Sequence, residues 1–297
     1  MSRTTSTLIG AIAILLWAFL ALCTAASGTI PPFQLNAMAF AVGTLVGMAK
    51  WIKAPSSIKK LRQPLMAWAL GVAGLFGYHF FYFTALRNAP PIDASLIGYL
   101  WPLLIVLFSA LLPGEQLKWQ HILGSILGLG GAVLIVTGGK GFTFNAEYGY
   151  GYFMAFLGAL TWSSYSVLSR RFANVPTDAV TGFCAATAVL SLGCHLLWET
   201  TVWPQDLLQW SAVIGVGLGP LGLAFYVWDH GVKHGDIQII GAASYATPLL
   251  STFLLVGFGY AQFTWAIGAA CLLITFGAVI ASKDMILGRR SRAVNAN

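Results

Sequence analysis

Residues 99–104 read Tyr-Leu-Trp-Pro-Leu-Leu, and residues 245–250 read Tyr-Ala-Thr-Pro-Leu-Leu. Both stretches lie inside long apolar runs, and both place a proline three residues after a tyrosine. Proline removes a backbone hydrogen-bond donor and clashes with the carbonyl four residues back, so each run predicts a helix interrupted near its middle. The two stretches are 146 residues apart, and this interval organises the whole chain.

The same interval recurs at other positions. Trp119 matches Trp265, Gly131-Ala132-Val133 matches Gly277-Ala278-Val279, Arg87 matches Lys233, and at 145 residues Trp17 matches Trp162. Internal matches at a fixed spacing indicate repeated structural units. We therefore predict two units of five helices each, over residues 1–137 and 149–297, joined by a linking loop at 138–148.

Composition predicts that these helices lie in a membrane. The 297 residues are 58% hydrophobic and only 8% charged, whereas soluble domains carry roughly 25% charged residues. Apolar runs of about 20 residues are long enough to cross a bilayer. The fold class is therefore an all-α integral membrane protein with ten predicted spans: 8–27, 33–52, 66–86, 91–112, 117–137, 149–170, 178–198, 208–230, 237–258 and 263–282.

The basic residues predict the orientation of the chain. With ten spans, 14 of the 16 Lys and Arg residues lie on the side of both termini, and only Arg87 and Lys140 lie on the other. Positive charge accumulates on the cytoplasmic side, so both termini are predicted there, in a bacterial inner membrane. Five is an odd number, so the second unit enters from the opposite side. This is the inverted-repeat architecture of many secondary transporters.

A matched pair of interrupted helices predicts a binding site between the two units. Irregular backbone at membrane depth is tolerated only beside other protein groups or a water-filled cavity. The predicted helix breaks are Pro102, Pro248 and Gly98, whose carbonyl loses its usual partner. The predicted substrate-binding residues are aromatic or polar: Trp17, Tyr78, His79, Tyr82, Tyr99, Trp101, Trp162, Ser244 and Tyr245. The other eight tryptophans, Trp228 among them, are interpreted as anchors at the membrane interface.

The chemistry of these residues favours a neutral, amphipathic ligand with a flat apolar part. An anionic phosphate ester would need Arg or Lys, and an organic cation would need a carboxylate. Asp93 and Asp229 are the nearest acids, both close to helix ends, and Asp229 is interpreted as marking the cytoplasmic interface. A zwitterionic aromatic amino acid fits this lining. We expect a monomer with no cofactor, no metal site and no nucleic-acid partner.

These residues carry a family resemblance over nearly the whole chain. The segments 95–103 and 243–249 resemble the helix-four and helix-nine signatures of the drug/metabolite transporter superfamily, EamA type, and Pro113-Gly114-Glu115 resembles its turn after helix four. The second copy reads Gly259-Tyr260-Ala261 there and lacks the acid. Within the superfamily, Tyr78-His79, Trp101 before Pro102 and the aromatic richness are most similar to its aromatic amino acid exporters. The resemblance implies alternating access around a central cavity, with export of Phe, Tyr and Trp.

Three other functions remain open at this point. A proton-coupled exporter of drugs or other small metabolites would share the fold and would need an essential membrane carboxylate. A membrane enzyme would need a nucleophile, an acid–base pair or a metal cluster, and only His79 with tyrosines is available. A receptor that transports nothing is the third alternative, and it would not explain why two helices are interrupted at matching positions.

Overall fold

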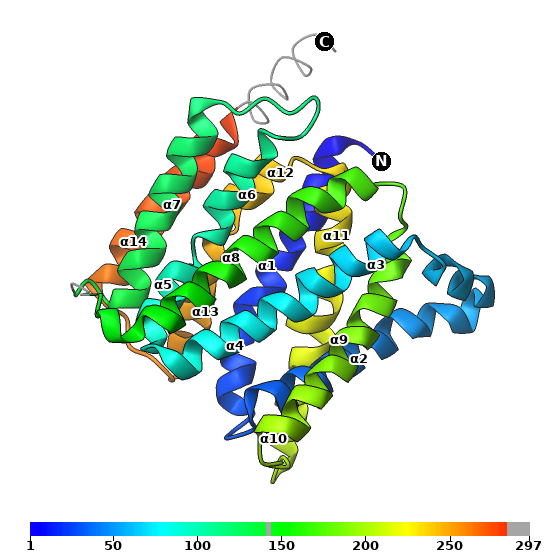
Figure 1. The fold of residues 1–297 in the computed structure, drawn as a ribbon. Coiled ribbons are helices and arrows are strands. Elements are labelled where there is room, and N and C mark those ends of the chain that lie inside the picture. The colour runs from blue at the N-terminus through cyan, green and yellow to red at the C-terminus, as the bar shows by residue number, and fades with distance from the viewer. Residues whose placement is uncertain (141–143, 284–297) are drawn as a thin grey trace.

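A computed structural model describes residues 1–140 and 144–283, and in this part of the chain helices are joined by short connections (Figure 1). Residues 141–143 of the linking loop, and residues 284–297 with the basic side chains Arg289, Arg290 and Arg292, lie outside the described part. The α-helices are α1 Arg3–Ala26, α2 Pro32–Lys53, α3 Leu65–Val72, α4 Tyr78–Asn88, α5 Pro91–Gly98, α6 Trp101–Ser109, α7 Trp119–Thr137, α8 Gly149–Leu168, α9 Val180–Trp198, α10 Leu207–Leu218, α11 Ala224–His234, α12 Ile237–Ala243, α13 Ala246–Gly257 and α14 Trp265–Ala281. The 3₁₀ segments are η1 Pro55–Leu61, η3 Ala146–Tyr148, η4 Ser169–Phe172 and η5 Thr177–Ala179, and the π-helical segments are η2 Ala73–Gly77 and η6 Gly219–Leu223.

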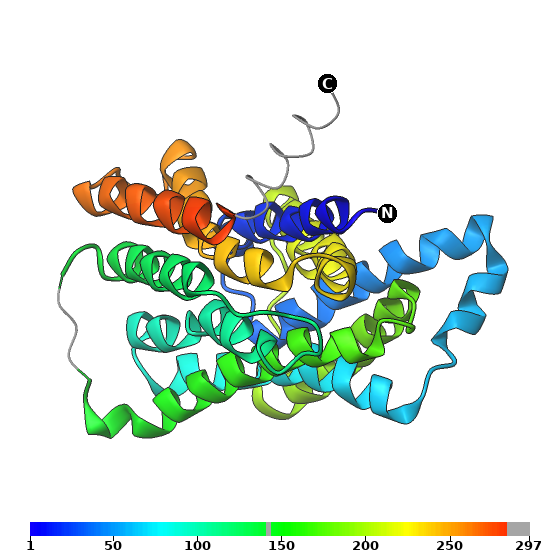
Figure 2. The same ribbon diagram turned by 90° about the horizontal axis from the view of Figure 1, so that it is seen from above.

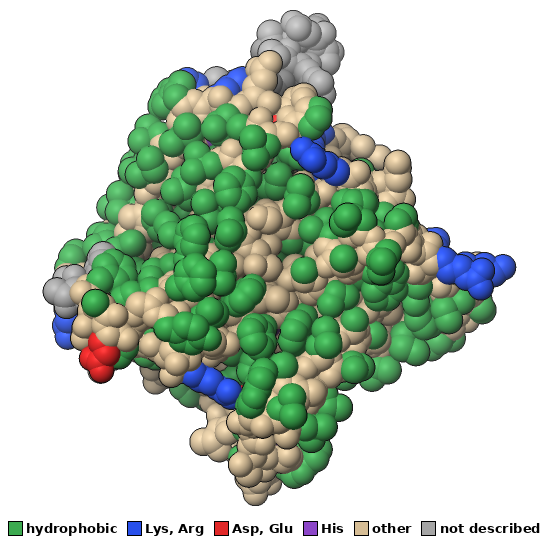
Figure 3. Space-filling model, viewed as in Figure 1, with side chains coloured by type: hydrophobic (Ala, Val, Ile, Leu, Met, Phe, Trp, Pro, Cys, Tyr) green, Lys and Arg blue, Asp and Glu red, His purple; other side chains and the backbone are tan. Residues whose placement is uncertain are grey.

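Eight helical stretches in the described residues are long and apolar enough to cross a membrane. Of the two other predicted spans, the one at α14 is a shorter apolar helix of 17 residues, and the one at α8 is a helix of 20 residues. Figure 3 shows hydrophobic side chains over most of the viewed face, with the few charged ones away from its middle. The chain is therefore an all-helical, multi-pass membrane protein.

Both predicted helix interruptions are present. The fourth span is divided into α5, which ends at Gly98, and α6, which begins at Trp101. The ninth is divided into α12, which ends at Ala243, and α13, which begins at Ala246. Pro102 and Pro248 lie in the first turn of α6 and α13, where a missing N–H removes no helical hydrogen bond.

The first interruption is held by a side chain from the second. The hydroxyl of Tyr245 donates to the carbonyl of Tyr99 at 3.1 Å and accepts from the N–H of Leu103 at 3.2 Å. In a regular helix these two backbone groups, four residues apart, would bond to each other. The phenol therefore takes the place of a missing helical hydrogen bond, and Tyr245 is fully buried as a result.

Two further interruptions were not predicted. Residues 66–86 and 208–230 were expected to be continuous helices, but each contains a π-helical segment, η2 and η6. In η6, Pro220 removes a backbone donor, which is a common cause of such a defect. The segment η2 contains no proline, and its sequence Ala-Gly-Leu-Phe-Gly gave no equivalent signal.

Glycine contacts bring helices from the two halves of the chain together. A Cβ atom at Gly124 of α7 would lie 2.5 Å from the carbonyl oxygen of Gly277 of α14, and a Cβ at Gly277 would lie 2.5 Å from the oxygen of Gly124. Figures 1 and 2 show these two helices side by side at one edge of the molecule. In the same way, Gly10 of α1 lies against Gly231 of α11. Small residues allow such close approach in membranes.

The hydroxyl of Tyr245 gives a stability prediction. Replacing Tyr245 by Phe leaves a buried carbonyl and a buried N–H without their partner, which costs about 1–3 kcal/mol. We expect Y245F to lower the thermal unfolding midpoint of the detergent-solubilised protein. The matched control is Y99F, because no hydrogen bond is recorded for the Tyr99 hydroxyl among the described residues. Equal unfolding midpoints for the two variants would contradict this role of Tyr245.

Candidate functional site

A cavity of about 650 Å³ opens between the two halves of the chain. This volume lies within the range of about 300–1,000 Å³ that is usual for small-molecule sites. Seven of the nine predicted binding residues line it, together with Gly98: Trp17, Tyr78, His79, Tyr82, Tyr99, Trp101 and Trp162. They come from α1, α4, α6 and α8 and from the break after α5. The helix interruptions thus lie beside a hollow.

Four tryptophans pack together at one end of this cavity, and we call them the tryptophan floor: Trp17, Trp101, Trp162 and Trp228. The ring of Trp17 lies 5.8 Å from that of Trp162 and 4.9 Å from that of Trp228, measured between ring centroids. Mutual edge contacts of this kind stabilise aromatic clusters. Trp17 is fixed further because its indole N–H donates to the carbonyl of Pro220, in η6, at 3.0 Å.

The interpretation of Trp228 as an interface anchor was wrong. Its side chain is fully buried, and its indole N–H donates to the hydroxyl of Ser166 at 3.1 Å. The predicted span ended at residue 230, which made Trp228 appear terminal. The helix α11 continues to His234, and its inward face carries Phe225, Trp228 and Val232.

Tyr78, His79 and Tyr82 form the wall of the cavity on α4. The rings of Tyr78 and Tyr82 are nearly parallel, with centroids 6.0 Å apart. His79 is buried, and its Nδ1 atom lies 2.7 Å from the carbonyl oxygen of Leu75, one turn earlier in η2. This wall therefore offers the cavity two phenol groups and one imidazole.

Two predicted binding residues do not line the cavity. The Ser244 hydroxyl is fully buried and donates to the carbonyl of Ile240 at 2.8 Å. Tyr245 fills the break before α6, as described above, so it supports Tyr99 from behind. Pro102 and Pro248 do not line the cavity either. They lie in the first turns of α6 and α13, the helices that follow the two breaks.

Sequence reasoning missed several polar residues of the lining: Asn36, Ser95, Thr247 and Ser251. Asn36 is buried near the start of α2, in a predominantly apolar span, and a buried polar residue there is a recognisable functional signal. Its Nδ2 group donates to the hydroxyl of Ser191 at 2.8 Å, and its Oδ1 atom has no recorded partner among the described residues. Thr247 immediately precedes Pro248 in the repeated stretch, so its position could have been inferred.

The described lining contains no Asp, Glu, Lys or Arg. Asp93 accepts a hydrogen bond from Tyr152 at 2.8 Å, outside the cavity. Asp229 is buried and forms an ion pair with Lys233 at 2.8 Å. It was expected to mark the cytoplasmic interface, and this buried ion pair was not anticipated. Among the described residues, no group of three or more His, Cys, Asp and Glu side chains could hold a metal ion. The described lining therefore offers a ligand aromatic faces and uncharged polar groups.

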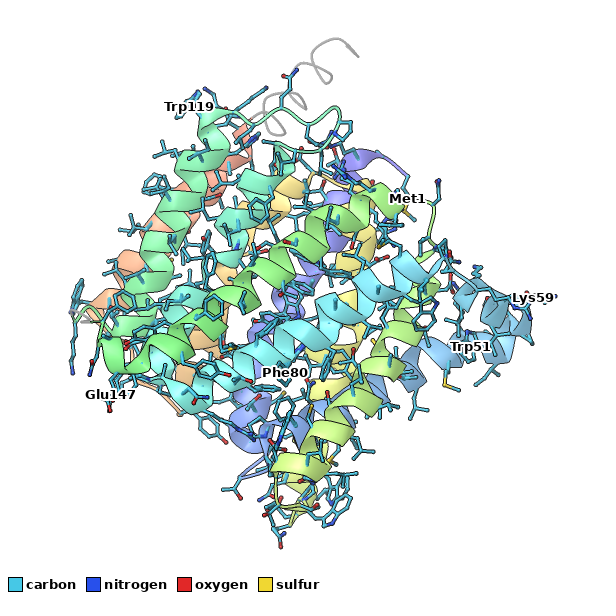
Figure 4. All side chains as sticks on the ribbon, in the orientation of Figure 1. Met1, Trp51, Lys59, Phe80, Trp119 and Glu147 are labelled. Carbon is cyan, nitrogen blue, oxygen red and sulfur yellow. The ribbon has the colours of Figure 1, made fainter. Side chains whose placement is uncertain are left out.

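Charged side chains join several segments on the side of the N-terminus. We call Arg3, Glu115, Arg170 and Asp236 the ionic cluster: Glu115 lies 2.8 Å from both arginines, and Arg3 lies 3.3 Å from Asp236. These residues tie the start of α1 to three connections, those before α7, after α8 and before α12. In Figure 4, Met1 lies toward the upper right and Lys59 at the right edge, whereas Glu147 lies toward the lower left, at the opposite end of the molecule.

The cavity opens toward the end of the molecule away from the ionic cluster. Its lining includes Thr24 and Ala25 at the end of α1, Pro32 at the start of α2 and Leu86 near the end of α4. At that end, Glu199 accepts hydrogen bonds from the backbone of Phe33 and Gln34 and pairs with Arg87 and His195. We call Glu199, Arg87 and His195 the outer cluster. It holds the start of α2 in place and leaves the cavity open.

Comparison with known proteins gives close relatives. The chain is 52% identical to a protein named aromatic amino acid exporter YddG from Ancylobacter novellus, over 98% of this chain and 100% of the relative. It is 26% identical to the protein of that name from Escherichia coli, over 94% and 97% of the two chains. A solved crystal structure at 52% identity superimposes with a TM-score of 0.90, covering 95% of this chain and 98% of that one.

The EamA-like transporter family matches the chain twice, at residues 4–137 and 149–283. These two matches cover nearly the whole of the described part. With the named relatives and the apolar helices, they identify a membrane transporter rather than an enzyme. The chain belongs to the EamA-like transporter family.

Proposed function

We propose that the protein exports aromatic amino acids by alternating access. The observation that carries this proposal is an uncharged, aromatic-lined cavity in a chain 52% identical, over almost its full length, to a protein named as an aromatic amino acid exporter. The contact residues are Trp17, Tyr78, His79, Tyr82, Tyr99, Trp101 and Trp162, with Tyr245 and Ser244 supporting them from behind. The ligand's ring packs on indole and phenol faces.

A zwitterion suits this cavity better than a net charge does. A carboxylate or ammonium group taken from water into an apolar site is costly unless hydrogen bonds replace its hydration. Hydroxyls of Ser95, Thr247, Ser251 and the lining tyrosines, with the imidazole and an amide, offer such bonds without adding charge. A ligand of net charge would meet no counter-ion there, so we expect basic and acidic amino acids to be excluded.

We infer that the two halves are inverted repeats of five helices each, residues 1–137 and 149–297, around the cavity. Element boundaries support this: η2, α4, α5 and α7 begin at residues 73, 78, 91 and 119, and η6, α11, α12 and α14 begin 146 residues later, at 219, 224, 237 and 265. The contact of α1 with α11 is mirrored by that of α8 with α4. With this arrangement we propose ten membrane helices, in a protein that acts as a monomer.

The described conformation corresponds to one of the two states that alternating access requires. The tryptophan floor and the ionic cluster close the side of the N-terminus, and the other side is open to Thr24. With both termini in the cytoplasm of a bacterial cell, this state faces outward. We expect the inward state to need separation of Arg3 and Arg170 from Glu115.

Transport itself is the decisive test. Protein reconstituted in vesicles should carry phenylalanine, tyrosine and tryptophan down their gradients, and should carry lysine and glutamate at least about tenfold more slowly. Because no Asp or Glu is among the described residues that line the cavity, an imposed pH gradient should leave the aromatic flux unchanged. Equal rates for the charged and aromatic amino acids would refute the proposal, and a flux that requires the pH gradient would refute uncoupled export.

Trp101 gives a test of aromatic recognition. W101A removes one face of the floor, so transport of tryptophan should fall about tenfold relative to that of leucine, a difference in line with the energy of aromatic contacts. The control is W119A, because Trp119 is 65% exposed at the start of α7. If W101A reduces both fluxes equally, Trp101 serves packing alone.

Glu115 gives a test of the closed side. E115Q weakens both pairs with arginine, so the inward state should gain population. In a background with all four cysteines replaced, labelling of Thr24→Cys by an impermeant maleimide from the open side should slow. The control is K60Q, which removes one ion pair, with Asp178, outside the ionic cluster. Unchanged labelling in E115Q would show that the ionic cluster does not hold this state.

The orientation has a separate test. A phosphatase or fluorescent reporter fused after Asn297 should report the cytoplasmic side, because 14 of 16 basic residues lie on the side predicted for both termini. Fusion within the connection 202–206 should report the opposite side. A periplasmic signal from the C-terminal fusion would contradict both the orientation and the even number of spans.

A further inference from the structure

We propose that His79 accepts a hydrogen bond from the substrate's ammonium group, and so fixes the amino end of the ligand at the wall formed by α2 and α4. This inference rests on the proposed function, because it takes an amino acid to be the occupant of the cavity. It assigns one polar group of the ligand to one atom, Nε2 of the imidazole.

The hydrogen bond at the other ring nitrogen fixes the tautomer. Nδ1 lies 2.7 Å from the carbonyl oxygen of Leu75, and a carbonyl only accepts. Nδ1 therefore carries the proton. In a neutral imidazole the second nitrogen, Nε2, then holds a lone pair and accepts hydrogen bonds. Leu75 belongs to η2, so the π-helical segment supplies the carbonyl that sets this tautomer.

The surroundings of the ring leave Nε2 to the cavity. Phe40, Phe83 and Phe225 lie with ring centroids 5.2, 5.9 and 6.2 Å from the imidazole, and these rings have no polar hydrogen. The ring of Tyr78 lies edge-on at 5.1 Å, and no hydrogen bond from its hydroxyl to the imidazole is recorded among the described residues. No hydrogen bond to Nε2 is recorded in the described part of the chain. His79 is only 6% exposed and lines the cavity. A donor from the ligand is thus the partner that this atom lacks.

An imidazolium ion is disfavoured at this position. The imidazole is surrounded by aromatic rings, three phenylalanines and Tyr78, and the described lining holds no carboxylate to compensate the charge of an imidazolium ion. Burial of an unpaired charge costs far more than burial of a neutral ring. The neutral form, with its free acceptor, therefore matches the geometry.

Asn36 adds a second acceptor to the same wall. Phe33 packs on Phe83 at 5.4 Å and Phe40 packs on His79, so Asn36 lies on the stretch of α2 between these two contacts with α4. Its Oδ1 atom is buried without a recorded partner among the described residues. Two unpaired acceptors on one wall give that wall a negative potential without net charge. An ammonium group is the complement of such a region.

A different part of the lining, on α13, carries hydroxyls that suit the carboxylate. Ser251 and Thr247 of α13 line the cavity, and the Thr247 hydroxyl has no recorded partner in the described residues. A hydroxyl donates readily to a carboxylate oxygen. The amino acid is thereby oriented with its ammonium toward α2 and α4, its carboxylate toward α13 and its ring on the tryptophan floor.

Three ligands and three variants test this assignment. Tryptophan and tryptophanamide both keep the ammonium, whereas indole-3-propionamide lacks it. Tryptophanamide carries a net charge and should bind the native protein more weakly than tryptophan, so each ligand is compared only between variants. Binding to purified protein is measured by competition with radiolabelled tryptophan. H79Q retains an acceptor near the position of Nε2, H79N retains a polar group only near Nδ1, and H79F retains neither. Thermal unfolding midpoints verify that each variant is folded.

We expect H79N and H79F to weaken tryptophan and tryptophanamide about tenfold, because a charge-assisted hydrogen bond is lost. Indole-3-propionamide should bind equally to all variants, and H79Q should stay within about threefold of the native protein. Equal weakening of the propionamide, or no weakening of any ligand, would overturn the assignment. Selective weakening of tryptophan without tryptophanamide would assign His79 to the carboxylate instead. Failure of the native protein to bind any of the three would count against the proposed function itself.

Discussion

The structure depends on one constraint: backbone N–H and C=O groups inside a membrane must find partners within the protein. Regular helix is interrupted near Pro102 and near Pro248, and at the first interruption the phenol of Tyr245 bonds to both Tyr99 and Leu103. The helix can therefore be interrupted without leaving these two backbone groups unpaired. The lining residues Gly98, Tyr99 and Trp101 lie at this interruption. The hydrogen bonds that stabilise it come from Tyr245, which does not line the cavity.

The membrane environment also restricts where charged side chains lie in this protein. Ionised side chains are kept at the ends of the molecule, in the ionic cluster, in the outer cluster around Glu199 and in the buried pair of Asp229 with Lys233. What remains between them is aromatic surface with scattered neutral polar groups. Such a site selects by shape and by hydrogen bonds, and an ion is penalised by its lost hydration.

Much of this arrangement could be predicted from sequence, because prolines and long apolar runs have direct consequences in a membrane. The breaks near Pro102 and Pro248 and seven of the lining residues were predicted in that way. Side-chain direction could not be predicted equally well. Tyr245 matches Tyr99 in the repeat, yet one ring fills a backbone gap while the other faces the hollow. Trp228 was misjudged because the end of its helix was placed four residues too early, at 230 instead of His234. Asn36 was overlooked within a predominantly apolar span.

The ionic cluster takes Arg3 and Glu115 from the first half of the chain and Arg170 and Asp236 from the second, and Ala261 occupies the place in the repeat that Glu115 has in the first half. In the proposed alternating-access cycle, an empty carrier must give up these ion pairs each time it returns to load. We therefore expect the return of the vacant protein to be the slow step of that cycle. Substrate present on both sides would let loaded carriers make that return, so exchange would run faster than one-way flow.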